Sequence, residues 1–119
     1  MAAAVLHQIL DYQPVEVFTV LLLNTKCQLL AVHDAAKGDI HSIAVNPSSI
    51  FRAALLANAA QIIVGHNHPS GDPTPSPEDI VLTNRLIAAG ALIGIDLVDH
   101  IIIGDKAHCS FKETGRMPA

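Results

Sequence analysis

Cysteine and long apolar stretches are scarce in this sequence of 119 residues. The two cysteines, Cys27 and Cys109, share no short metal-type spacing and cannot make a disulfide framework for a domain of this size. No apolar run approaches the roughly 18 residues that a membrane span needs. The start of the chain also lacks the basic segment of a signal peptide. We therefore expect a soluble, cytoplasmic protein with no membrane contact.

Basic residues are also few. Lysine and arginine number 7 against 11 aspartates and glutamates, which gives a formal net charge of −4, and the cations are scattered along the chain. Non-specific binding to nucleic acids depends on clustered cations that neutralise phosphates and release counterions. The charge of this chain therefore argues against DNA binding.

Apolar residues, in contrast, make up 50% of the sequence. This fraction excludes a disordered chain. A globular protein of this length buries roughly 65% of its unfolded surface, which is enough for a core without disulfides. Since no linker, repeat or low-complexity tract interrupts the chain, we expect residues 1–119 to form a single domain.

Apolar periodicity and turn residues divide the chain into helices and strands. The pairs Asn46-Pro47 and Ser76-Pro77 predict helix starts, and Ile62-Ile63-Val64-Gly65 is typical of a central strand. We expect helices over 1–13, 46–58 and from 76 to Gly90 or Gly94, strands over 15–23, 28–32, 40–45, 62–65, 97–103 and 107–111, and a tail over 115–119. This mixture predicts an α/β (α+β) fold, a three-layer domain with a mixed, mainly antiparallel sheet flanked by helices.

Two histidines follow the expected central strand. In an extended segment residues i and i+2 point to the same side, so His66 and His68 can converge on one metal ion. Asp79 lies eleven residues after His68, and it is the third helical residue if Ser76 is the N-cap. Its carboxylate then lies at the helix entrance, near the histidines. Two histidines and one carboxylate leave a fourth tetrahedral position open for water, as in catalytic zinc sites.

A hydrolytic zinc site also needs a group that takes a proton from water and returns it to a leaving group. Glu16 is the candidate, because it opens the apolar run 17–21. A carboxylate on a core strand is costly unless it faces a polar site.

Each of these residues also has a simpler interpretation. Ser76-x-x-Asp79 matches a capping box, which would account for both residues without a metal. Glu16 could be an ordinary surface residue at a strand end, and the His66 and His68 pair could line a polar rim.

The whole run 65–79 resembles the metal-binding signature of the JAB/MPN superfamily, the JAMM motif, in which His-x-His-Pro is followed by a short loop and Ser-x-x-Asp. More narrowly, residues 16–111 resemble the RadC family, long called DNA-repair proteins. The resemblance implies a single JAB/MPN-like domain with His66, His68 and Asp79 as zinc ligands. It further implies that Glu16 activates water and that Ser76 helps to stabilise the oxyanion.

These observations favour a zinc-dependent hydrolase of the JAMM metallopeptidase or isopeptidase type, with Glu16 as general base and a peptide or other amide as substrate. Two other functions stay open: a non-catalytic protein-binding module, and a DNA-repair factor, as the RadC name suggests. His100 precedes an apolar strand, and we expect it to orient a ligand through its ring rather than to act in catalysis. Exposed strand edges would allow a homodimer.

Overall fold

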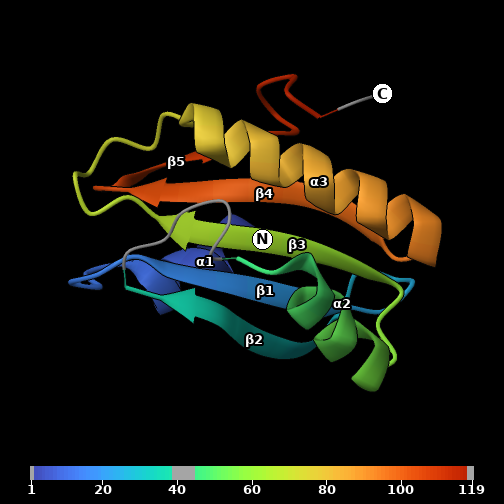
Figure 1. Ribbon diagram of the computed structural model, residues 1–119. Coiled ribbons are helices and arrows are strands. Elements are labelled where there is room, and N and C mark those ends of the chain that lie inside the picture. Colours follow the sequence, from blue (N-terminus) through green and yellow to red (C-terminus); the bar gives the residue numbers. More distant parts are fainter. Residues whose placement is uncertain (1, 39–44, 118–119) are drawn as a thin grey trace.

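The sheet joins strands that are far apart in the sequence (Figure 1). The computed structural model describes residues 2–38 and 45–117. Along them lie α1 (Ala2–Leu10), β1 (Val17–Leu23), β2 (Leu29–Lys37), α2 (Pro47–Leu56), β3 (Gln61–Asn67), α3 (Pro77–Ile93), β4 (Asp96–Gly104) and β5 (Ala107–Ser110). The strands form a five-stranded sheet in the order β2-β1-β3-β4-β5.

Strand directions in this sheet are mixed. β1 pairs antiparallel with β2 and β3, β4 pairs antiparallel with β5, and β3 and β4 run parallel. This confirms the predicted mixed, mainly antiparallel sheet. Parallel neighbours need a crossover connection, which α3 provides. The loop 68–76 between β3 and α3 therefore lies at the carboxyl end of β3, where open α/β sheets commonly bind their ligands.

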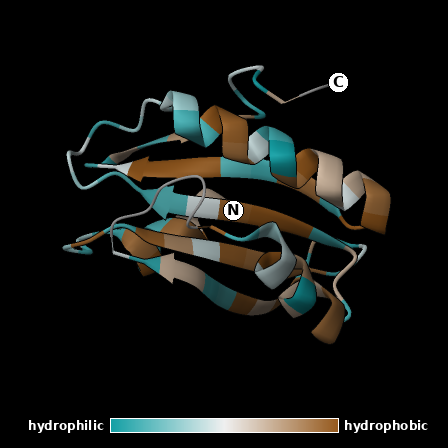
Figure 2. Cartoon of the chain, in the orientation of Figure 1, coloured by the Kyte–Doolittle hydropathy of each residue, from teal (hydrophilic) through white to brown (hydrophobic). Residues whose placement is uncertain are grey.

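Helices cover both faces of the sheet, as predicted for a three-layer domain (Figure 1). α1 packs Leu6 and Leu10 on one face, while α2 and α3 pack Ile50 and Leu86 on the other. Because both faces are covered, every residue of β1 is buried. Figure 2 shows β3 as apolar over most of its length and polar at its carboxyl end.

The predicted helix starts are present. The Asn46 side chain accepts a hydrogen bond from the N–H of Ser48 at the start of α2, and Ser76 is the N-cap of α3. Of the two glycines expected to end α3, Gly94 is the C-cap, with φ of 87°, whereas Gly90 lies within the helix. In the described part of the chain no helix combines the length and apolarity needed to cross a membrane.

Two element boundaries near the start of the chain differ from the predictions by more than two residues. α1 ends at Leu10 instead of residue 13 because the chain turns at Tyr12, where φ is +64°. The strand expected over 28–32 runs on to Lys37, since β2 pairs with β1 as far as Val17. Pairing with a neighbour, rather than local β preference, makes residues 33–37 a strand.

Other differences concern the middle and end of the chain. His66 and Asn67, expected to follow the central strand, belong to β3 because they pair with β4. The strand expected over 40–45 lies outside the described residues except for Val45, which is buried. At the C-terminal end, Met117 packs against the core on the α3 side.

Gly104, the last residue of β4, lets the loop after β3 lie directly on the sheet. A Cβ atom there would meet the carbonyl oxygen of Gly71 at 2.4 Å and Cδ of Pro73 at 2.8 Å. The N–H of Asp105 donates to the same Gly71 oxygen at 2.8 Å, and the N–H of Gly71 donates to the oxygen of His68 at 2.9 Å. The close approach at Gly104 thus fixes the loop that begins at His68.

We expect Gly104→Ala to lower the free energy of unfolding by about 1–3 kcal/mol, because the methyl group would push the loop backbone off the sheet. Gly65→Ala is the matched control, since its Cβ would meet mainly the terminal methyl carbons of Leu6, at 2.7 Å, which can rotate away. Urea denaturation of the three proteins would measure both losses. A loss for Gly65→Ala equal to or larger than that for Gly104→Ala would contradict this account.

Candidate metal centre

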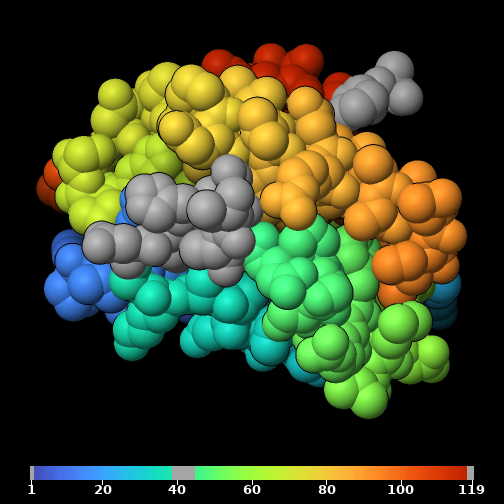
Figure 3. Space-filling view, in the orientation of Figure 1, coloured from blue at the N-terminus to red at the C-terminus, as the bar shows by residue number. Residues whose placement is uncertain are grey.

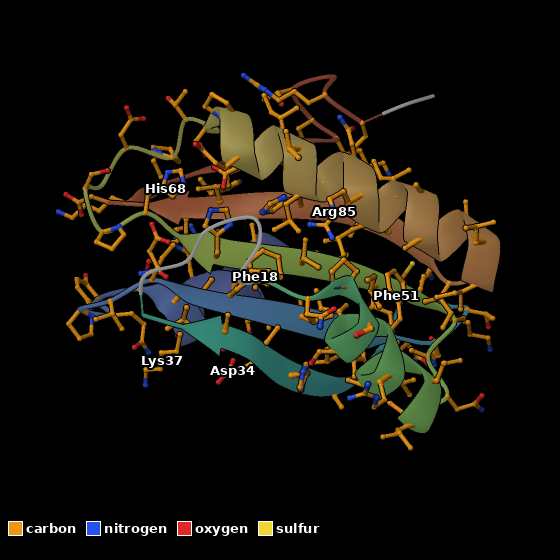
Figure 4. The ribbon with its side chains drawn as sticks, viewed as in Figure 1. Phe18, Asp34, Lys37, Phe51, His68 and Arg85 are labelled. Carbon is orange, nitrogen blue, oxygen red and sulfur yellow. The ribbon has the colours of Figure 1, made fainter. Side chains whose placement is uncertain are left out.

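The end of β3 directs two histidines toward α3. Phe18, which faces the α3 side of the sheet, pairs with His66 in the neighbouring strand, so the His66 ring lies on that side. His68 follows two residues later, and its N–H continues the pairing by donating to the oxygen of Ile103 at 2.9 Å. Nε2 of His66 lies 3.1 Å from Nε2 of His68. Figure 4 shows His68 near the start of α3.

Asp79 reaches the same point from the first turn of α3. The side chain of Ser76 accepts the N–H of Asp79, and Oδ2 of Asp79 accepts the N–H of Ser76 at 2.8 Å, which is a capping box. The same carboxylate lies 3.1 Å from each ring, with Oδ1 facing Nε2 of His66 and Oδ2 facing Nε2 of His68. Capping and convergence with the histidines therefore coexist. In Figure 3 the loop and the start of α3 lie together at one side of the surface.

His66, His68 and Asp79 could hold a metal ion. One nitrogen or oxygen of each lies within 4.8 Å of the others. In a tetrahedral zinc site with bonds of about 2.0–2.2 Å, neighbouring donor atoms are roughly 3.4 Å apart, close to the 3.1 Å separations here. The side chains are 3%, 15% and 13% exposed, so the residues fit a small, partly buried divalent cation.

The charge of Asp79 favours such a cation, whereas a metal at His68 has to replace the proton that the contact with Asp79 favours there. The hydrogen bond with Asp79 is the main cause that raises the pKa of His68, against the opposing effect of burial. Burial alone would raise the pKa of Asp79, but contacts with His66, His68 and the Ser76 N–H outweigh it and hold that pKa well below its usual range. Asp79 therefore stays ionised at neutral pH, as a metal ligand must.

Glu16 lies just before β1, half-buried, and its charge contributes to the raised pKa of His68. Asn67 holds the backbone on both sides of Glu16. Its Oδ1 accepts the N–H of Val17 at 2.7 Å, and its Nδ2 donates to the oxygen of Val15 at 3.0 Å. Sequence reasoning passed over Asn67. Its place between two histidines on a strand was the available signal, because it must face the side opposite to theirs.

His100, on β4, supports the cluster from inside the protein. It is fully buried, and its Nε2 lies 2.9 Å from Nδ1 of His66. Its Nδ1 lies 2.6 Å from Oγ1 of Thr83 on α3. Burial, together with the nearby His66, lowers the pKa of His100 well below its usual value, so the ring is neutral. The geometry matches the ring contact predicted for His100, and Thr83 is a partner that the sequence did not indicate.

Comparison with known proteins points to one family. The model of the family described as RadC-like JAB domain matches residues 1–116. A UPF0758 protein of Desulforamulus reducens is 56% identical over 100 residues, which are 84% of this chain and 44% of that protein. A UPF0758 protein of Desulforudis audaxviator is 46% identical over 114 residues, 96% of this chain and 50% of that protein. The chain thus spans about half the length of these curated relatives.

The pairing of His68 with Asp79 should make stability depend on pH when metal is chelated. The raised pKa of His68 adds stability below its ordinary value of 6.5, which is lost as pH rises through the folded value. The lowered pKa of Asp79 adds stability above its ordinary value of 3.8, which is lost as pH falls. Asp79→Asn should therefore cost about 1–3 kcal/mol between these two values and less at higher pH.

Urea denaturation from acid to mildly alkaline pH would measure this difference in free energy of unfolding. Glu78→Gln is the control, because this exposed neighbour carries the same charge in the same helical turn. A difference between wild type and Asp79→Asn that stayed constant as pH rose above 6.5 would refute the assignment.

Proposed function

Because the chain belongs to the family of RadC-like JAB domains, we propose that it is a zinc-dependent hydrolase of the JAMM metallopeptidase or isopeptidase type, acting on the amide bond of a peptide substrate. The observation that carries this proposal is the meeting of His66, His68 and Asp79 within 4.8 Å. Two imidazoles and one carboxylate are a donor set of catalytic zinc sites, which keep one position open.

In this proposal Nε2 of His66, Nε2 of His68 and the carboxylate of Asp79 hold the zinc, which supplies a Lewis acid that activates water and polarises the amide carbonyl. The three side chains come from the end of β3, the first residue of the loop that follows it and the first turn of α3. Hydrogen bonds of the loop to Asp105 and of the cap at Ser76 fix both elements. The ligands are therefore held in place before a metal binds, which limits the cost of ordering them.

Glu16 is the general base and acid of the proposed reaction. Its carboxylate takes a proton from the attacking water and gives it to the nitrogen of the leaving amine. The two hydrogen bonds of Asn67 hold the backbone at Val15 and Val17, so the strand that carries the histidines also sets the position of Glu16. Its effect on the pKa of His68 supports a location beside the cluster.

Ser76 is proposed to donate a hydrogen bond to the developing oxyanion. Its Oγ accepts the N–H of Asp79 at 3.1 Å, which leaves the hydroxyl proton for another partner. A hydroxyl held by the helix cap costs no reorganisation when the negative charge develops.

A pocket of about 270 Å³ opens beside the cluster. Its walls include His68, Tyr12 from the turn after α1, and Asp105 and Lys106 from the turn between β4 and β5. We propose that it receives part of the substrate on one side of the scissile bond, since it shares His68 with the cluster.

Protein purified without chelators should contain about one zinc per chain, measured by elemental analysis. His68→Ala and Asp79→Asn should each lose it, because two remaining donors bind zinc far more weakly, while Glu78→Gln should keep it. Absence of zinc in the wild type, with no uptake when zinc is added, would overturn the hydrolase and favour a protein-binding module.

Glu16→Gln should keep its zinc, but its rate of amide hydrolysis should fall roughly 10²–10⁴-fold. The reason is that the glutamine side chain cannot accept the proton from water. Asn67→Ser should also keep zinc and lose a smaller part of the rate, since Glu16 stays but its backbone is released. The measurement is hydrolysis of a peptide library by the zinc-loaded proteins. Full activity of Glu16→Gln would exclude Glu16 as the base.

A further inference from the structure

A line of buried hydrogen bonds links two of the three candidate ligands through the interior. It starts at Nδ1 of His66, 2.9 Å from Nε2 of His100. It continues from Nδ1 of His100 to Oγ1 of Thr83, 2.6 Å away. It ends where the hydroxyl of Thr83 donates to the main-chain oxygen of Asp79 at 2.7 Å. His66, His100 and Thr83 are 3%, 0% and 1% exposed, so water does not compete for these groups.

The donor and the acceptor of each hydrogen bond in this line follow from its last group, the main-chain oxygen of Asp79. The oxygen of Asp79 can only accept, so the single hydroxyl proton of Thr83 is used there. Oγ1 must then accept from Nδ1 of His100. This ring is fully buried, which disfavours its charged form, so its single hydrogen lies on Nδ1. Nε2 of His100 becomes an acceptor, and Nδ1 of His66 must donate to it. In the neutral ring of His66 the lone pair is then on Nε2, the atom that faces His68 and Asp79.

We propose that Thr83 and His100 are positioning residues that select the metal-binding tautomer of His66 and tie its ring to the backbone of Asp79. The inference rests on the proposed function in one respect, that a metal binds at Nε2 of His66. The hydroxyl of Thr83 sets which nitrogen of each ring donates and which accepts. Without it, Nδ1 of His100 has no acceptor, and either tautomer of the two rings becomes accessible.

Two phenylalanines keep the rings in this orientation. Phe111 stacks on His100 with ring centroids 4.8 Å apart and planes 15° apart. Phe18 stacks on His66 at 5.7 Å and meets the edge of His100 at 5.8 Å. Both phenylalanines are buried. Packing therefore fixes where the nitrogens point, and the hydroxyl of Thr83 decides which of them carry hydrogen.

Thr83→Val tests the inference, because valine has nearly the shape of threonine and lacks the hydroxyl. We expect zinc affinity, measured by competition with a chromogenic chelator, to fall about 10–100-fold. Thr83→Ser restores the hydroxyl and should bind within about threefold of wild type. Leu86→Val, a buried change one turn further along α3, is the control for loosened packing, and its zinc affinity should equal that of wild type.

The outcomes separate the inference from the proposed function. If wild type takes up no zinc, the proposed function fails and the affinity part of the inference fails with it. If wild type binds zinc and Thr83→Val binds it as tightly, only the inference is overturned.

Nitrogen-15 NMR of the histidine rings tests the hydrogen positions in wild-type protein and does not depend on any variant folding. We expect a protonated Nδ1 and an unprotonated Nε2 on His100, in both metal-free and zinc-loaded protein. With zinc bound, Nδ1 of His66 should carry its hydrogen. A hydrogen on Nε2 of His100 would overturn the assigned direction.

Discussion

The alternation of side chains at the carboxyl end of β3 is the constraint on which the rest of the site depends. Three consecutive residues, the last two of β3 and the one that follows it, face alternate sides of the sheet. His66 and His68 face α3, where Asp79 meets them. Asn67 faces the other way and holds Val15 and Val17. A shift of this strand by one residue would exchange the two sides and dismantle both arrangements together.

The first turn of α3 has two tasks that reinforce each other. The carboxylate of Asp79 closes the capping box with Ser76 and also faces both histidines. A capping role and a ligand role therefore do not compete for this residue, because its two oxygens and their lone pairs serve both. The helix terminus that the cap stabilises is the same terminus that brings the carboxylate to the cluster. A change that weakens the cap would therefore also disturb the geometry of the site.

The support of the cluster extends into the core. His100 and Thr83 lie where a polar group must be fully hydrogen-bonded to be tolerated, and each finds its partners in the line from His66 to Asp79. Asp99, the residue before His100, points its carboxylate to the N–H of Lys112 and to Ser110. The polar interior of β4 is thus divided between the cluster and the turn after β5. These contacts lie within a chain that spans about half the length of the two UPF0758 relatives described above.

Features that depend only on neighbours along the chain follow from the sequence alone. The helix starts at Pro47 and Pro77, the buried strand before His66, and the common side of His66 and His68 follow from local preferences and from the period of a strand. The family resemblance, carried by fixed spacing in one short segment, also belongs here. Glu16 was a candidate from its place at the start of an apolar run, and the resemblance implied its role in activating water.

Three features depend instead on contacts between distant segments: the length of β2, the hydrogen bonds of Asn67 to Val15 and Val17, and the direction of the hydrogen bonds through Thr83. Asn67 and Val17 are 50 residues apart, and Thr83 and His100 are 17 apart on different elements. Such contacts depend on which strands become neighbours and on which face each helix covers. Local preference carries no information about either, because both follow from burying the whole set of apolar faces at once.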